Sequence, residues 1–378
     1  MRVLYLTAGN IVHDSRFLKK MSETGYEVHY LPIFQSGIVP HLPGVTIHLL
    51  GPKSQPRTVS ILQLLTYLRV FARFLRILRR VRPDVLHAGF VQSCGLMAAA
   101  SGFHPFVLSP MGSDIFVYPQ RSSILKKITQ YVLRQTDVVT CDSRTLLRHV
   151  LALSAPGHHS VEELTWGVDP RLFRPDPGER SRTRQELMCE NAKLVVMTRN
   201  FHPVYGVSDF IASLPHVIGS IPEARFLLIG DGPLRQELEA QVKESSLQTK
   251  VRFLGHIANK EMPRFLNAAD LYVSSSFSDS TSVSLLEAMA CGLPVVVTDV
   301  PTNFEWVRPG VGGLVVPKSS PAELGEAIVR IFALTDADRQ QMGDSNRRIV
   351  EDRADWARSF QKLEEIYQGL VSRADYGR

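Results

Sequence analysis

Short apolar runs alternate with amphipathic stretches along the whole chain. In the first half, an amphipathic helix is expected from about Ser15, with Asp14 as its N-cap, and the longest helix from about Ser60 to Val81. Short strands separated by helices are typical of a parallel, doubly wound sheet. The strands predicted for this half are Val3–Thr7, Glu27–Leu31, Val45–Leu50, Asp84–His87, Phe106–Leu108 and Asp137–Thr140.

The same alternation restarts after a Pro/Arg-rich stretch of low periodicity, residues 166–177, which is interpreted as a linker. Helices are expected near 207–219, 233–245, 260–268, 282–291 and 321–333. The strands predicted for this half are Leu194–Thr198, Arg225–Gly230, Val251–Gly255, Leu271–Ser274, Pro294–Thr298 and Gly313–Val316. The chain is therefore divided into a first domain over 1–165, the linker, a second domain over 178–350, and a C-terminal helical segment over 351–378.

The C-terminal segment is mostly charged, but its apolar residues recur at helical spacing. Trp356, Phe360, Leu363 and Ile366 fall on one face of a helix, which predicts that this face is buried.

Length and composition place the chain among two-domain globular proteins. It has 378 residues, of which 44% are hydrophobic, and no apolar run approaches the ~20 residues that a membrane helix needs. The four cysteines are scattered, without metal-binding spacing, and the N-terminus enters a strand directly. We expect a cytoplasmic protein with reduced thiols. Peripheral contact with the inner face of the membrane stays open.

Positive charge is concentrated in the first half of the chain. Residues 1–165 carry 18 lysine and arginine residues against 9 aspartate and glutamate residues, whereas the remainder carries 25 against 28. No nucleic-acid-binding motif accompanies this excess, so nucleic acid is not expected as a partner. An anionic acceptor or a membrane surface fits the charge at least as well.

The most informative chemistry lies between Ser274 and Thr298. Asp279 and Glu287 stand eight residues apart, and the turn after Asp279 runs into an apolar helix. Ser280, Thr281 and Ser282 can cap that helix, so that backbone N–H groups up to Val283 face an anion at its N-terminus. Two carboxylates flanking an anion suit a nucleotide diphosphate that carries a sugar at one end and a ribose at the other.

This segment resembles the E-x7-E region of the family 4 glycosyltransferases, closely so at SLLEAMACGLPVV. It departs from the family at the first acid, which is Asp279 instead of Glu, and in the turn Asp279-Ser280-Thr281-Ser282, which replaces a glycine-containing turn. The resemblance implies the GT-B fold: two Rossmann-like domains with doubly wound parallel sheets facing a cleft, and a C-terminal helix returning to the first domain. It also implies transfer of a sugar from a UDP- or GDP-sugar to a hydroxyl acceptor, a glycan, a lipid-linked molecule or a small molecule, with retention at the anomeric carbon. No metal is expected, and no D-x-D metal motif suggests one.

The resemblance assigns several donor-binding residues, and one of them departs from the family pattern. Arg199 follows a strand and matches the arginine of G-R-x-x-x-x-K-G, which contacts the diphosphate. The lysine of that motif is missing, and Tyr205-Gly206 stands near its place.

Glu287 is expected to take the ribose hydroxyls. Asp279 is expected near the donor sugar, where it can stabilise positive charge.

A second donor-binding group is expected at the turn Gly230-Asp231-Gly232-Pro233, beside the nucleotide. His256 lies in the loop after the next strand, near the base. The turn also resembles a dinucleotide fingerprint, but Arg235 occupies the position of the third glycine. A tight turn without ligand contact is the alternative for both glycines.

Acceptor-side residues are expected in the first domain. The Gly9-Asn10 turn ends the first strand, and Asp14 follows it either as a helix cap or as a functional residue. Ser113 and Asp114 lie in the place of the family's H-G-x-D loop, with Met111 where histidine is common. There Asp114 can orient or deprotonate an acceptor hydroxyl.

His87 ends another strand of this domain and is either an acceptor-side residue or a histidine of the core.

The helix expected from Ser60 to Val81 carries a basic stripe made of Arg69, Arg73, Arg76 and Arg80. The stripe is either a solvated face or a docking site for anionic lipid.

Three other functions remain open from the sequence. They are a non-catalytic relative that binds nucleotide sugar, a GT-B phosphorylase or epimerase, and a nicotinamide oxidoreductase.

Overall fold

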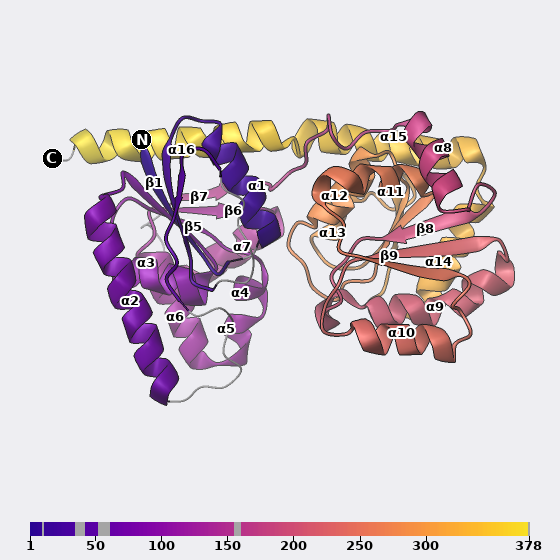
Figure 1. Cartoon of the computed structure of the whole chain (residues 1–378), viewed down its shortest axis with the longest axis horizontal. Coiled ribbons are helices and arrows are strands. Elements are labelled where there is room, and N and C mark those ends of the chain that lie inside the picture. Colours follow the sequence, from indigo (N-terminus) through magenta and orange to yellow (C-terminus); the bar gives the residue numbers. More distant parts are fainter. Residues whose placement is uncertain (10, 35–41, 52–60, 155–159, 377–378) are drawn as a thin grey trace. The chain divides into compact units, whose positions relative to one another are not determined.

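The computed structural model describes residues 1–9, 11–34, 42–51, 61–154 and 160–376, and the chain forms two compact units (Figure 1). The first unit consists of Met1–Leu164 together with Phe360–Arg378, and the second consists of Thr165–Ser359. No helix among the described residues is long and apolar enough to cross a membrane.

The sheet of the first unit has seven parallel strands within the described residues, in the order β3-β2-β1-β4-β5-β6-β7. The strands are β1 Arg2–Thr7, β2 Glu27–Pro32, β3 Val45–Ile47, β4 Val85–Gly89, β5 Phe106–Ser109, β6 Val138–Cys141 and β7 Ser160–Glu163. The helices are α1 Ile11–Ser22, α2 Ile61–Val81, the π-helical turn η1 Val91–Gly95, α3 Leu96–Ala100, α4 Ser113–Phe116, α5 Tyr118–Arg121, α6 Ser123–Arg134 and α7 Arg144–Leu153.

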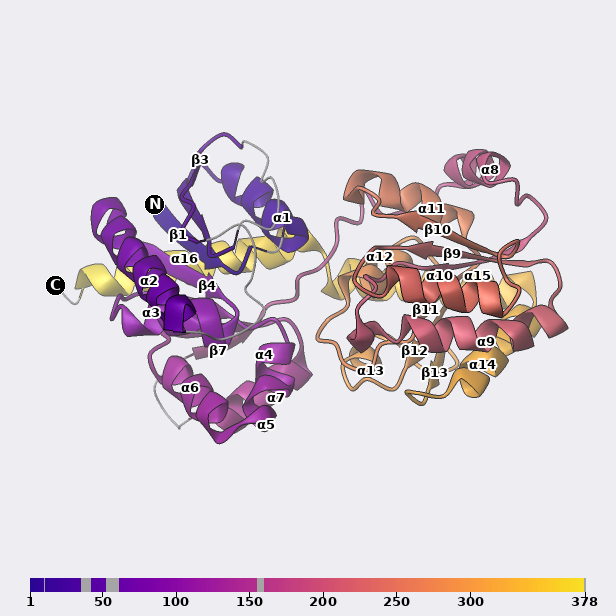
Figure 2. The same ribbon diagram turned by 60° about the horizontal axis from the view of Figure 1, so that its bottom comes forward.

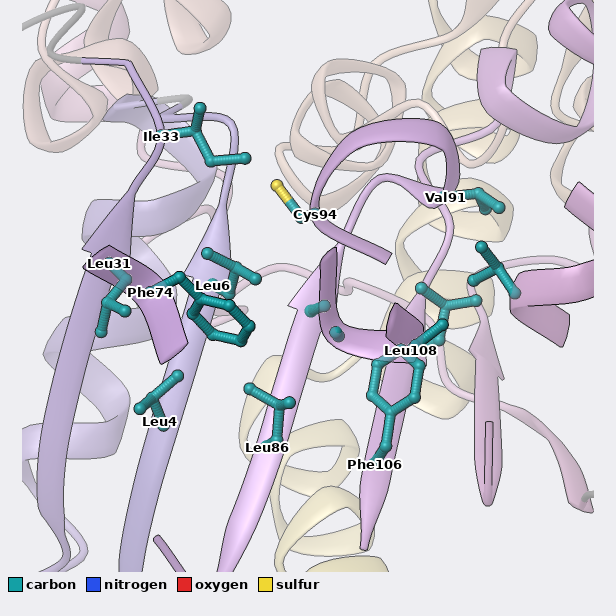
Figure 3. Packing of buried hydrophobic residues seen from close by; sticks show 14 of the residues in the cluster. Leu4, Leu6, Leu31, Ile33, Phe74, Leu86, Val91, Cys94, Phe106 and Leu108 are labelled. Atoms are coloured by element: carbon teal, nitrogen blue, oxygen red, sulfur yellow. The ribbon is translucent and has the colours of Figure 1, made fainter. Parts of the chain in front are cut away.

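Alternate residues of these strands point to opposite faces of the sheet. Leu4 and Leu6 of β1 belong to the cluster that Phe74 of α2 completes, and Figure 3 shows the Phe74 ring among these side chains. Tyr5, between them in sequence, stacks instead on Phe17 of α1, with ring centroids 4.4 Å apart. Because both faces are covered, the central strands are largely apolar, as expected for a parallel sheet.

The C-terminal helix α16, Trp356–Tyr376, packs with the first unit from Phe360 onward, which confirms the predicted return of this helix. Phe360 lies edge-on to Phe17 at 5.8 Å. The predicted buried face is correct for Trp356, Phe360 and Leu363, but Ile366 is only partly buried and Tyr367 replaces it on that face. A helix advances 100° per residue, so this stripe continues at 367 and 370.

The sheet of the second unit has six parallel strands within the described residues, in the order β10-β9-β8-β11-β12-β13. The strands are β8 Lys193–Met197, β9 Ala224–Ile229, β10 Val251–Gly255, β11 Leu271–Ser274, β12 Val295–Thr298 and β13 Gly313–Val316. The helical elements are α8 Pro177–Glu186, the 3₁₀ turn η2 Pro203–Tyr205, α9 Val207–Ser220, α10 Arg235–Glu244, the 3₁₀ turn η3 Asn259–Glu261, α11 Met262–Ala268, α12 Val283–Ala290, α13 Asn303–Trp306, α14 Pro321–Ala333 and α15 Asp336–Arg353.

Two separate hydrophobic clusters cover the two faces of this sheet. Val196 and Tyr272 face the cluster built with α11, α12 and α15, whereas Val195 and Val273 face the one built with α9, α10 and α14 (Figures 1 and 2). The apolar runs of the sequence therefore supply both layers of the core.

The strand order reverses beside β8, where β9 lies on one side and β11 on the other. In open α/β sheets, ligands bind at the carboxyl ends of the strands at such a reversal. The residues that follow β8 and β11 therefore mark the place for a site in the second unit.

Three differences between the observed and the predicted elements stand out. Strand β7 was missed because its sequence, Ser160–Glu163, is polar and only partly buried. Strand β3 ends at Ile47 instead of Leu50. Helix α1 begins at Ile11, so the prediction that Asp14 is its N-cap is wrong.

The segment 166–177 belongs to the second unit. Trp166 stacks on Trp356 with ring centroids 5.7 Å apart, and Val168 forms a β-bridge with Asp355. These contacts fix the segment to the end of the second unit.

Candidate active site

The guanidinium group of Arg199 is the centre of a polar cluster at the carboxyl end of β8. Its Nη1 donates hydrogen bonds to Ser282 Oγ at 2.7 Å and to Ser284 Oγ at 3.0 Å. Its Nη2 donates to Asp279 Oδ2 at 2.5 Å. Burial acts to lower the pKa of Arg199, but Asp279 and the nearby tyrosines raise it, and the pKa lies above its ordinary value. Arg199 therefore stays charged.

Helix α12 begins beside this cluster, as the Ser/Thr-rich turn predicted. Ser282 is its N-cap, and the Ser282 hydroxyl accepts a hydrogen bond from the Leu285 N–H. The Thr302 hydroxyl donates to the backbone carbonyl of Asp279 at 3.2 Å, which fixes the start of the turn. A helix N-terminus with unpaired N–H groups and a positive dipole end favours a bound anion.

Tyr205 covers one face of the guanidinium. The Arg199 Cζ lies 4.1 Å from the centre of the Tyr205 ring, a cation–π contact. The turn that carries Tyr205 is tied to the loop after β11, because the Ser275 hydroxyl donates to the Gly206 carbonyl at 2.7 Å. Gly206 has φ +58°, and a Cβ there would lie 2.2 Å from the Ser275 carbonyl oxygen, so glycine is required. Tyr205, which stands near the place of the motif's lysine, thus covers Arg199 without supplying a charge.

Glu287 is a buried carboxylate one helical turn after the start of α12, with 6% of its surface exposed. Asn259 Nδ2 donates a hydrogen bond to Glu287 Oε1 at 2.8 Å. Asn259 belongs to η3, which follows β10, so the two side chains come from different elements. An oriented, buried carboxylate is suited to accept hydrogen bonds from a vicinal diol.

Gly230 and Gly232 are explained by the packing of two loops against each other. A Cβ at Gly230 would lie 2.1 Å from the Arg199 carbonyl oxygen, and one at Gly232 would lie 2.6 Å from that of Phe201. The turn is further held by the Phe201 N–H, which donates to the Asp231 carbonyl at 2.9 Å. Both glycines therefore have a structural reason, and their contact with a nucleotide stays a prediction.

The remaining predicted donor residues lie around the start of α12 or after β10. Ser280 and Thr281 are buried in the turn, and Val283 is the first residue of the helix. His256 follows β10 and is exposed. Among the described residues, no three His, Cys, Asp or Glu side chains gather where they could hold a metal ion.

Asp114, in the first unit, is fully buried and holds two loops together. Its Oδ2 accepts a hydrogen bond from the Val91 N–H and its Oδ1 accepts one from the Met111 N–H, both at 2.9 Å. Burial raises the pKa of Asp114 to about 6, against these backbone hydrogen bonds, which lower it. Asp114 therefore positions these two loops through its hydrogen bonds, which argues against direct contact with an acceptor.

His87 is a histidine of the core. Its Nδ1 is hydrogen bonded to the Tyr367 hydroxyl, and its Nε2 to the Ser109 hydroxyl at 2.7 Å. Burial lowers the pKa of His87 to about 3, so the ring is neutral. His87 has 1% of its surface exposed and joins strand β4 to helix α16. It is therefore better described as a histidine of the core than as an acceptor-side residue.

Asp14 is also fully buried and accepts hydrogen bonds from the Thr7 hydroxyl at 2.7 Å and from the Tyr30 hydroxyl at 2.6 Å. The Gly9 N–H donates to Thr7 Oγ1 at 3.1 Å, so Gly9 is held by the same network. Ser113 is exposed at the start of α4, and Asn10 lies outside the described residues.

Sequence reasoning missed three residues of the second-unit cluster. Ser284 receives the Arg199 hydrogen bond, and its hydroxyl also accepts one from Tyr272 at 3.1 Å. Its position two residues after the cap was a usable signal. Asn259 and Thr302 act from separate loops, and nothing in the sequence connects them to Glu287 or Asp279.

Two family models match the chain, one over each half. The model described as "Glycosyl transferase 4-like" matches residues 2–143, and the one described as "Glycosyl transferases group 1" matches residues 192–333. The chain therefore belongs to the family 4 glycosyltransferases of GT-B fold, which confirms the predicted family.

Similar proteins with curated names are glycosyltransferases. The chain is 25% identical to the N-acetyl-alpha-D-glucosaminyl L-malate synthase of Bacillus anthracis over 370 residues, 96% of this chain and 94% of that protein. It is 29% identical, over 77% of its length and 78% of the other, to a GDP-mannose-dependent monoacylated alpha-(1-6)-phosphatidylinositol monomannoside mannosyltransferase of Corynebacterium glutamicum.

The fold is also that of a solved structure, Anabaena HepE in complex with UDP and glucose. The TM-score is 0.80 at 20% identity, with 98% of this chain and all of the other covered. At this identity the likeness concerns the fold.

Proposed function

We propose that the protein transfers a sugar from a UDP- or GDP-sugar to a hydroxyl acceptor with retention at the anomeric carbon. The observation that carries the proposal is the start of α12, where Ser282 caps the helix and the Asn259-oriented Glu287 lies one turn further on. The diphosphate would lie at the helix N-terminus and the ribose at Glu287. Names of the relatives support it, since they include GDP-mannose as donor and α-linked products.

In the proposed reaction, the acceptor hydroxyl attacks the anomeric carbon on the face that the diphosphate leaves. The bond between this carbon and the diphosphate oxygen breaks, and the bond to the acceptor oxygen forms. The acceptor proton passes to the leaving diphosphate. The dipole of α12 and its N–H groups stabilise the charge that develops on the leaving group.

We also propose that transfer needs no metal, because N–H groups of the helix and side-chain hydroxyls bind the diphosphate. Turnover should then be unchanged in excess EDTA. A loss of turnover in EDTA that added Mg²⁺ restores would contradict metal-free transfer.

A thermal-shift panel of nucleotide sugars tests the donor proposal. Nucleotide sugars of one base, either the UDP-sugars or the GDP-sugars, should raise the melting temperature of the protein, whereas NAD should not. No shift with any nucleotide would contradict the proposal. A shift without transfer to any acceptor fraction would favour a non-catalytic nucleotide-sugar-binding protein.

We further propose that the acceptor is carried by, or lies near, an anionic lipid surface. Arg69, Arg73, Arg76 and Arg80 are all exposed on α2, whose opposite face is buried through residues such as Phe74. Three of these arginines line a pocket of about 420 Å³ together with Leu50 and Gly51, and Tyr67 and Leu68 are exposed on the same helix. A basic surface with exposed apolar side chains suits the interface of a membrane.

Sedimentation with liposomes tests this surface. Each basic residue near an anionic surface contributes about 1 kcal/mol, so changing the four arginines to glutamine should abolish binding to phosphatidylglycerol vesicles. A matched control removes four exposed charges elsewhere in the same unit, at Arg121, Lys126, Lys127 and Arg134. Equal losses in both variants, or no loss in the first, would contradict docking through α2.

A further inference from the structure

We infer that Arg199 acts on the donor through Asp279: it cancels the charge of that carboxylate so that an anionic diphosphate can occupy the start of α12. In this assignment Arg199 is a positioning residue and not the principal cation bound to the diphosphate. The inference rests on the proposed function, because it concerns the same nucleotide site.

The surroundings of the guanidinium carry the inference. Arg199 is 8% exposed, and its Nη atoms are directed at Ser282, Ser284 and Asp279. Tyr205 covers its face at 4.1 Å. Its Nε is buried as well. The head group is thus enclosed by protein atoms, which leaves little of it to meet a ligand.

Asp279 explains why a cation is needed there. Its carboxylate, with 20% of the side chain exposed, stands at the turn that leads into α12. An unpaired carboxylate close to a diphosphate would repel it, and in a partly buried place this repulsion is weakly screened. The Arg199–Asp279 pair carries no net charge, so the diphosphate meets only the hydroxyls, the N–H groups and the helix dipole.

The two possible roles of Arg199 give opposite results in a double-mutant cycle. If Arg199 neutralises Asp279, then Arg199→Gln leaves a partly buried carboxylate unpaired and lowers the affinity for UDP or GDP, about tenfold or more. Asp279→Asn frees the cation and raises that affinity. The double variant, which has neither charge, regains an affinity within about threefold of wild type. If Arg199 is instead the direct diphosphate ligand, the double variant stays as weak as Arg199→Gln.

Isothermal titration calorimetry with UDP and with GDP measures the four affinities. A control pair of the same chemistry is Arg180 and Asp270, which are hydrogen bonded at the amino end of β11. Arg180→Gln and Asp270→Asn should leave the affinities unchanged. Failure of the double variant to recover, or weaker binding by Asp279→Asn, overturns the inference.

Urea unfolding of the same variants separates failure of the inference from failure of the proposed function. If wild type binds neither UDP nor GDP, the proposed function fails. The pairing is still judged by stability: Arg199→Gln should be less stable than the double variant. A double variant that is no more stable than Arg199→Gln overturns the pairing.

Discussion

Replacement of Glu287 by glutamine removes the charge of the proposed ribose carboxylate and keeps its shape. Glu287 is 6% exposed, and the Asn259 side chain donates to its Oε1 at 2.8 Å. A glutamine can keep its carbonyl oxygen toward Asn259. The substitution therefore puts an amide nitrogen, which cannot accept a hydrogen bond, in place of the second carboxylate oxygen. The packing of α12 is preserved.

The size of the effect follows from the hydrogen bonds that a diol would make. A hydrogen bond to a charged group contributes about 1.5–3 kcal/mol, against about 1 kcal/mol for a neutral one. Because the amide nitrogen cannot accept, the variant loses at least one such bond. We expect the affinity for the nucleotide diphosphate to fall roughly 10- to 100-fold, since each 1.4 kcal/mol corresponds to about tenfold.

Deoxynucleotides make the assay specific to the ribose. Isothermal titration calorimetry of wild type should show weaker binding of 2′-deoxy and 3′-deoxy forms of the preferred UDP or GDP. In Glu287→Gln this preference for the ribonucleotide should largely vanish. Glu326→Gln is a suitable control, because Glu326 is an exposed carboxylate of α14 that pairs with His216 at 3.2 Å. An undiminished ribose preference in Glu287→Gln would refute the assignment.

Three further predictions concern Asn259 of the second unit and Phe360 and His87 of the first. Asn259→Ala should weaken nucleotide binding about fivefold by releasing Glu287, with little change in melting temperature because Asn259 is exposed; an unchanged affinity would contradict its role. Phe360→Ala should lower the free energy of unfolding by about 3–5 kcal/mol, measured in urea, and a loss below about 1 kcal/mol would contradict the docking of α16. His87 stays neutral in the folded protein because its pKa lies near 3 instead of 6.5, so stability should be full above pH 6.5 and fall as the pH drops toward 3, by up to about 1.4 kcal/mol per pH unit. His87→Gln should flatten this slope in urea unfolding, and an unchanged slope would contradict it.

The sequence predicted the sheets well because both faces of each are buried, which makes every central strand a short apolar run. It failed where burial is partial, as at the polar strand Ser160–Glu163. It also failed where a small shift along a helix decides the outcome, about one turn at Ile11 and one residue at Tyr367.

The candidate site was predictable where one segment supplies it. The turn, its cap Ser282 and the carboxylate of Glu287 are contiguous in sequence. Contacts between distant loops carry no local pattern, so Asn259 and Thr302 were not found. The same holds for residues assigned by position alone: Asp114 lies in α4 and His87 in the middle of β4, and the side chains of both are directed into the protein. Position within a motif does not report the direction of a side chain.

The most direct measurement of the central claim is the anomeric configuration of the transferred sugar. The nucleotide sugar that raises the melting temperature is incubated with the protein and lipid or glycan fractions, and the product is analysed by proton NMR. An α-linked product from an α-configured donor, with release of the nucleoside diphosphate, is the predicted result. A β-linked product, or release of a nucleoside monophosphate, would contradict retaining transfer from the site at α12.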